Sequence, residues 1–332
     1  MFLLIAPAYL STKELYAYIV TLGLRFCLQW GYCPTSSYFY AGYGIILNIL
    51  FKDIARSSFY GKVALNLSER FIDQGAVPAT KFLVGAFIIP LTKHIRYSIE
   101  ILKSGFEMGI TVGDFIYGVY ALAQLMACQF VSGKNLNELN RELQEYKDFV
   151  SKVKAHNRGF MFVGAQQAIL ALKGKTHHPS MMGSDTFNEE EFFKTIIALN
   201  FPLTLFFVYV FKMQITFLFD KYEECLEISQ KASEISYAVK GHPINIEKDY
   251  YTALALTQLS TDKPPEIVRK NLKQAYEILK RLKKNAEYCP ANYLNKYLLI
   301  KAEIARLNRN RDQAIELYDK AIESARENGF IQ

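Results

Sequence analysis

Hydrophobic residues recur every three or four positions through most of this 332-residue chain. That period places them on one face of an α-helix, whereas a half-buried strand would need alternation at every second position. The chain shows no sustained alternation of the second kind. It is therefore predicted to be all-α, with each helix hiding one apolar face against a neighbour.

The clearest pattern lies in residues 296–332, which predict two helices joined by a tight polar turn. Small residues at the facing positions let the helix axes approach closely, and two larger side chains fill the remaining space. Asn310 can cap the second helix together with Gln313, and Asn328-Gly329 can end it in a left-handed conformation. The residues expected to pack the hairpin are Leu298, Ala302, Ala305, Ala314, Tyr318 and Ala321.

A single helical hairpin cannot bury its apolar face alone, so it needs another hairpin stacked on it. Polar turns recur near positions 53, 133, 220 and 310, each between an apolar helix and an amphipathic one. These features predict a tetratricopeptide-like α-solenoid of six to eight antiparallel helical hairpins.

The longest polar break, residues 174–188, is rich in Gly, Pro, Ser and His and is expected to be a loop. It divides the predicted solenoid into an N-terminal half, 1–173, and a C-terminal half, 189–332. Within the second half, the tetratricopeptide-like hairpins are expected at about 205–238 and 295–328.

Composition adds little chemistry to this picture. The formal net charge of +7 is mild for the length and does not indicate nucleic acid as a partner. Five cysteines without a C-x-x-C pair fit a reduced, cytoplasmic chain. The first ten residues are apolar but lack the basic start of a signal peptide.

One stretch, residues 195–211, is apolar enough to be considered as a membrane span. It is short for that purpose, and Asn200 and Pro202 interrupt it. A buried solenoid helix is the preferred interpretation, and a membrane-associated helical protein is kept as an alternative.

Four segments resemble a narrower family when taken in order. They are 41–47 (AGYGIIL), 61–67 (GKVALNL), 288–292 (YCPAN) and 311–332 (RDQAIELYDKAIESARENGFIQ). Together they look like the tetratricopeptide-like helical middle region of very large bacterial signalling proteins, common in cyanobacteria. Those proteins combine a serine/threonine kinase, an AAA-like ATPase, this helical region, a GAF sensor and a histidine kinase.

The resemblance implies a scaffold that links the ATPase to the GAF and histidine kinase parts in signal transduction. Its partners would be a protein or the neighbouring domains. Because the chain stops at Gln332 directly after a helical hairpin, a fragment of such a kinase is expected. A stand-alone tetratricopeptide-like regulator that binds a peptide or protein is the alternative.

No catalytic motif of that family occurs in the chain, so it is predicted not to be an enzyme. Gly174-Lys175-Thr176 resembles the end of a phosphate-binding loop, but Ile169 stands where such a loop needs glycine. His177-His178 is the one histidine pair, and too few other ligands lie near it for metal. The prediction therefore includes no catalytic residue, no cofactor and no metal site.

Basic residues concentrate in the amphipathic helix predicted over 266–286. A solvated helix face is the simple interpretation, and a docking face for an acidic partner is the functional one. Nucleic acid is not expected, because aromatic residues do not alternate with these charges. The candidate docking residues are Arg269, Lys270, Lys273, Lys280, Arg281 and Lys284.

Overall fold

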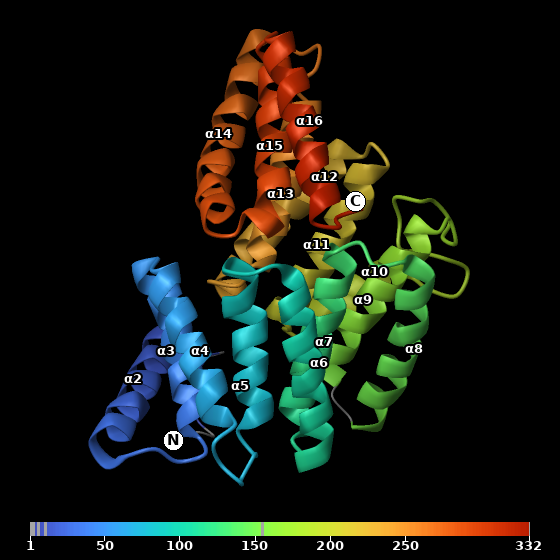
Figure 1. The fold of residues 1–332 in the computed structure, drawn as a ribbon. Coiled ribbons are helices and arrows are strands. Elements are labelled where there is room, and N and C mark those ends of the chain that lie inside the picture. Colours follow the sequence, from blue (N-terminus) through green and yellow to red (C-terminus); the bar gives the residue numbers. More distant parts are fainter. Residues whose placement is uncertain (1–3, 5–6, 10–11, 154–155, 332) are drawn as a thin grey trace. The chain divides into compact units, whose positions relative to one another are not determined.

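The computed structural model describes residue 4 and residues 7–9, 12–153 and 156–331 (Figure 1). These residues form helices and turns, and an isolated bridge between Ser184 and Phe187 is their only β contact. The all-α prediction is confirmed for this part of the chain. The chain folds into two compact units, Met1–Cys128 and Gln129–Gln332.

The first unit consists of successive helices in which α3 packs on α4, α5 on α6, and α2 on α3. Short π-helical and 3-10 turns, η2 and η3, continue α5 without a break in the chain. The last helix, α7, begins in this unit and ends in the second one. The elements are α2 (Lys13–Trp30), α3 (Ser36–Phe51), α4 (Ile54–Ser68), α5 (Val77–Leu83), η2 (Val84–Ile88), η3 (Ile89–Leu91), α6 (Ile95–Val112) and α7 (Phe115–Val131).

Two glycines allow Ile88 of η2 to enter the contact between α3 and α4. A Cβ atom on Gly44 would lie 2.9 Å from Ile88 Cδ1, and one on Gly61 would lie 3.0 Å from Ile88 Cγ2. Both distances are too short for an ordinary carbon contact. These glycines belong to the segments 41–47 and 61–67 that carry the family resemblance, so packing alone explains why small residues stand there.

The second unit is built around α11, whose residues from Thr204 to Thr216 are all buried. Helices α9, α10, α12 and α13 contact it, which explains why its sequence is apolar on every side. The elements are α8 (Leu136–Lys152), α9 (His156–Leu172), α10 (Glu189–Ala198), α11 (Pro202–Leu218), α12 (Tyr222–Glu234), η4 (Ser236–Val239), α13 (Ile244–Gln258), α14 (Pro265–Tyr288), α15 (Pro290–Leu307) and α16 (Arg311–Glu327).

From α11 to α16 each helix packs on the next, and every second helix also makes contact, α11 with α13 and α13 with α15. Figure 1 shows α14, α15 and α16 lying side by side at the C-terminal end of this unit. Three helical pairs, α11–α12, α13–α14 and α15–α16, therefore stack in one row. Each pair covers the apolar face that the previous pair leaves open.

The stretch once considered as a membrane span is divided between two helices. α10 ends at Ala198, Asn200 adopts a left-handed φ of 54°, and α11 begins at Pro202. Its second part is the core helix of the second unit. In the portion of the chain that the structure describes, no helix has both the length and the apolar character needed to cross a membrane.

The boundary between the compact units lies upstream of the predicted division at 174–188. Residues 173–188 do form a loop between α9 and α10, but α9 packs on α11 beyond that loop. The polar break is therefore a loop inside the second unit. Chain composition marked where the backbone is irregular, while the unit boundary depends on which helices share a core.

Candidate functional site

The α15–α16 hairpin brings five of the six expected packing residues into one cluster. Ala302, Ala305, Ala314 and Leu317 form a buried cluster, and the partly buried side chains of Leu298 and Tyr318 pack against it. Ala321 is buried on the same helix as Ala314. The alanines let the two helices approach closely, and the larger side chains close the edges of the contact.

The hairpin also holds a buried carboxylate, Glu303, which the apolar pattern did not reveal. The Tyr318 hydroxyl donates to Glu303 Oε1 at 2.5 Å, and Arg306 Nη2 donates to Oε2 at 2.8 Å. Gln258 Nε2, from α13, donates to the same Oε2 at 3.1 Å. Burial and the bond to Glu303 raise the pKa of Tyr318 to about 12. Glu303 thus joins three helices through one side chain.

Helix α14 presents the predicted basic residues to solvent. Its buried face consists of Ala275, Ile278, Leu282 and Ala286, and all six candidate docking residues are exposed. Arg281 Nη2 lies 2.8 Å from Asp249 Oδ2 of α13, so part of its charge is compensated within the fold. The ion pairs found among the described residues include none of the other five, which are Arg269, Lys270, Lys273, Lys280 and Lys284.

Two of these residues, Arg269 and Lys273, line a groove of about 940 Å³ that the α13–α14 turn, α14 and the end of α15 enclose. We call it the basic groove. Val268, Leu272 and Leu307 supply apolar surface in it. Its cationic residues are Lys263, Arg269, Lys273, Arg306 and Arg309, and its acidic residues are Asp262 and Glu277.

The structure thus divides the predicted docking face. Arg269 and Lys273 join Arg306, from the last turn of α15, and Arg309, from the α15–α16 turn, whereas Lys270, Lys280, Arg281 and Lys284 do not line the groove. Arg306 is engaged by Glu303, but Arg309 is exposed. The contribution of the α15–α16 turn was missed because it depends on how two hairpins stack. The basic run N-R-N-R at 308–311 was its only trace in the sequence.

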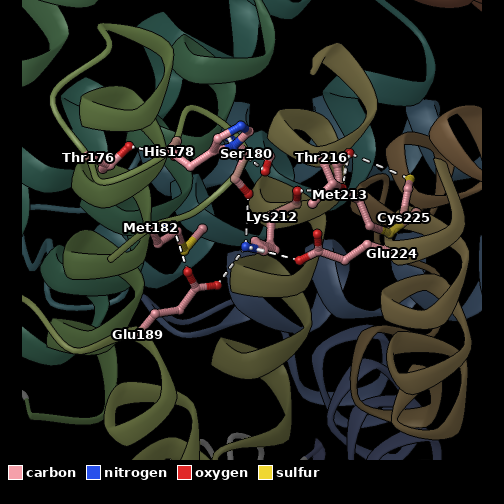
Figure 2. A network of polar contacts seen from close by, with 10 residues as sticks. All are labelled: Thr176, His178, Ser180, Met182, Glu189, Lys212, Met213, Thr216, Glu224 and Cys225. Atoms are coloured by element: carbon pink, nitrogen blue, oxygen red, sulfur yellow. Dashed lines mark hydrogen bonds and ion pairs between the residues drawn. The ribbon is translucent and has the colours of Figure 1, made fainter. Parts of the chain in front are cut away.

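A second charged site lies at the middle of α11, where the Lys212 side chain is 5% exposed (Figure 2). Its Nζ lies 2.7 Å from Glu189 Oε1 and 3.2 Å from Glu224 Oε1. The same ammonium donates to the carbonyl oxygen of Ser180 at 2.9 Å. A buried ammonium needs such partners because desolvation of an isolated charge is costly.

This network fastens the 174–188 loop to the core of the second unit. The other oxygen of Glu189 accepts the Met182 backbone N–H at 2.7 Å (Figure 2). Within the loop, the Thr176 hydroxyl donates to the carbonyl oxygen of His178 at 2.9 Å. His178 Nδ1 lies 2.8 Å from Ser180 Oγ. Glu189, the first residue of α10, therefore binds a buried lysine, and its negative charge also suits the N-terminus of that helix.

The histidine pair of this loop does not form a metal cluster. His177 Nε2 lies 2.9 Å from Asp185 Oδ1 at an exposed position, and His178 contacts Ser180. Across the described part of the chain, no group of three or more His, Cys, Asp or Glu side chains is arranged to hold a metal ion.

From α11 to α16 the second unit is thus a row of stacked helical pairs, and the basic groove lies between the last two pairs. No family model matches the chain. Over 179 residues it is 26% identical to hybrid signal transduction histidine kinase G of Dictyostelium discoideum. The match covers 52% of this chain and 5% of that relative. The chain thus has a distant similarity to a small part of a long signalling protein.

Proposed function

We propose that this chain is a non-catalytic, tetratricopeptide-like interaction module of a histidine-kinase-type signalling protein, and that the basic groove binds an acidic segment. The observation that carries the proposal is the convergence of Arg269 and Lys273 with Arg309 around one groove. These three cations come from two different hairpins, and none of them occurs in the ion pairs found among the described residues.

The chemistry of the groove favours an acidic peptide with some apolar side chains. Besides Arg306, which is paired with Glu303, four cationic residues stand against two acidic ones in the groove, and this excess of positive charge attracts carboxylates. Val268, Leu272 and Leu307 offer apolar contact between the charges. A segment with Asp or Glu beside Leu or Ile would match both properties.

The signalling role rests on the resemblance of segments 41–47, 61–67, 288–292 and 311–332 and on the similarity to the Dictyostelium kinase. In this proposal the helical stack joins an ATPase to a GAF sensor and a histidine kinase. A change at one end would pass along the nearest-neighbour contacts of the stacked pairs. The kinase activity itself belongs to the relative.

The test measures binding of a fluorescein-labelled peptide of alternating Glu and Leu to the purified full chain by fluorescence anisotropy. The double variant Arg269→Glu/Lys273→Glu should weaken binding by at least about tenfold, because two groove cations become repulsive. The matched control, Lys280→Glu/Lys284→Glu, changes the same charge on the same helix outside the groove. It should weaken binding by less than about threefold at 0.15 M salt, where charges beyond about 8 Å are screened.

Equal losses in the two double variants would show a diffuse electrostatic surface and overturn the groove as the binding site. Absence of peptide binding by the wild-type chain would overturn the proposal as a whole. Hydrolysis of ATP by the purified chain itself would contradict the proposal that the module is non-catalytic. Circular dichroism of each variant checks that the helical fold is retained.

A further inference from the structure

Two cysteines meet at the end of α2, around a single serine hydroxyl. Cys27 Sγ lies 3.1 Å from Ser36 Oγ, and Cys33 Sγ lies 3.5 Å from the same oxygen. Ser36 also accepts the Cys33 backbone N–H at 2.9 Å, which fixes the turn between α2 and α3. The two sulfurs are therefore separated by one oxygen atom, although the sequence places five residues between them.

The environments of the two thiols differ. Cys33 is exposed and Cys27 is buried. Burial raises the pKa of Cys27. The hydrogen bond with Ser36 lowers this pKa and the nearby Cys33 raises it, so the net shift is upward. At Cys33 burial opposes ionisation, but hydrogen bonds from Thr35 and Ser36 outweigh it and lower the pKa. Cys33 thus has the properties of an attacking thiol, and Cys27 those of a thiol that reacts afterwards.

We propose that Cys27 and Cys33 form a peroxide-sensitive pair in which exposed Cys33 is oxidised first and buried Cys27 then closes a disulfide. The proposal rests on the shared Ser36 contact and on the contrast in exposure, and it is independent of the basic groove. The other cysteines, Cys128, Cys225 and Cys289, are buried, and they serve as internal controls.

The reaction takes hydrogen peroxide as the oxidant and balances in two steps. The Cys33 thiolate attacks one peroxide oxygen, the O–O bond breaks, and the departing hydroxide takes a proton and leaves as water. Cys33 is then a sulfenic acid. The Cys27 thiolate attacks the Cys33 sulfur, an S–S bond forms, and the S–O bond breaks. The second hydroxide takes the proton lost by Cys27, so two thiols and one peroxide become one disulfide and two waters.

Gly31 gives the turn the freedom to close. It ends α2 with a φ of 92°, a conformation that favours glycine. The disulfide would join the last turns of α2 to the residues preceding α3. It would also enclose Trp30, the single tryptophan of the chain, which is 76% exposed. A fluorescent reporter therefore stands inside the loop that the reaction would close.

The experiment treats the reduced full chain, freed of reductant, with a small excess of hydrogen peroxide at neutral pH. Free thiols are then blocked with N-ethylmaleimide and the protein is digested. Cleavage after Arg25 and Lys52 releases both cysteines on one tryptic peptide, 26–52. We expect that peptide to lose two hydrogens and to carry no maleimide. Further cleavage by chymotrypsin after Trp30 or Tyr32 should leave two chains joined by the disulfide.

Trp30 fluorescence should change as the disulfide forms and should recover after dithiothreitol is added. In Cys27→Ser, Cys33 should accumulate as a sulfenic acid that dimedone traps. In Cys33→Ser, oxidation of Cys27 should slow by more than about tenfold, because the accessible thiolate is gone.

The proposal is overturned if wild-type peptide 26–52 keeps two blocked thiols, if Cys33 gains oxygen while Cys27 stays free, or if Cys128, Cys225 or Cys289 reacts as fast. Because the main measurement uses the wild-type chain, the result does not depend on the folding of a variant.

Discussion

Lys296 of α15 and Glu247 of α13 form an ion pair in which both side chains are more than nine-tenths buried. The Lys296 ammonium also lies 5.3 Å from the centroid of the Tyr250 ring. Seven residues further along α15, Glu303 binds Gln258 of the same neighbouring helix. The contact between stacked hairpins therefore contains charged groups at two levels, and each is satisfied only when α13 and α15 lie in the correct register.

Removing one member of the buried pair should be costly. Lys296→Met leaves the Glu247 carboxylate buried without its partner, so we expect a loss of about 3–5 kcal/mol in the free energy of unfolding. The double variant Lys296→Met/Glu247→Leu should recover most of that loss, because no charge remains buried. Urea denaturation measures both. Lys320→Met, which breaks an exposed pair with Glu316 on α16, is the control and should leave stability nearly unchanged.

The Lys212 network should hold the 174–188 loop closed. In Lys212→Met the anchor for Glu189 and for the Ser180 carbonyl is lost, so trypsin should cut at Lys173 and Lys175 faster. We expect the cleavage rate to rise by about tenfold, since local opening would cost at least about 1.4 kcal/mol less. Lys194→Met breaks only an exposed pair with Glu190 and should be cut like the wild type. Equal cleavage of the two variants would show that Lys212 does not hold the loop.

Stability should fall in mild acid because of His242. Burial, and secondarily the charge of Arg158, lower its pKa from 6.5 to about 3. Since the unfolded state binds this proton first, stability is complete above pH 6.5 and declines as the pH falls toward 3. Between pH 7 and pH 5 the loss should be about 2 kcal/mol. His242→Asn removes the titrating group, so its urea midpoint should depend less on pH over that interval. An unchanged slope in this variant would contradict the assignment.

Substitutions at two helix ends should show how much the left-handed backbone conformation costs there. Arg309 has a φ of 60° and Gly329 a φ of 69°, and each ends a helix of the last hairpin. Arg309→Gly should stabilise the protein by about 0.5–1 kcal/mol, because glycine adopts this conformation without steric strain. Gly329→Ala should destabilise it by about 1 kcal/mol for the same reason. Thermal unfolding followed by circular dichroism measures both, and shifts of the same sign would contradict this explanation.

The turns between helices could be predicted from short stretches of sequence. The structure has a left-handed residue next to each predicted turn, at Lys52, Gly133, Asp220 and Arg309. The Asn310 cap is also present, since Asn310 Oδ1 accepts the Gln313 N–H at 3.3 Å. Such features depend on a few consecutive residues, so the sequence is enough to locate them. At Arg309 the motif closes with a bond from Asn310 N–H to the Ala305 carbonyl, although arginine is a poor residue for that position.

Charged residues were harder to place. Lys212 directly follows the apolar run 195–211, yet it is buried within a core helix. His242 follows a glycine at a break between helices, yet its ring packs against Phe207 with centroids 5.2 Å apart. In each case the partners that make burial possible come from other helices, and no local pattern identifies them.

Periodicity and turn residues were sufficient to define the helices and the apolar face of each, because a helix is a local structure whose hydrogen bonds close within four residues. Three features needed the folded chain: the boundary at Cys128, the convergence of Arg269 with Arg309, and the meeting of Cys27 with Cys33. The groove and the unit boundary result from contacts between helices distant in sequence, and the cysteine pair results from the path of one turn. Such contacts depend on how side chains fill space, which the order of residues alone does not display.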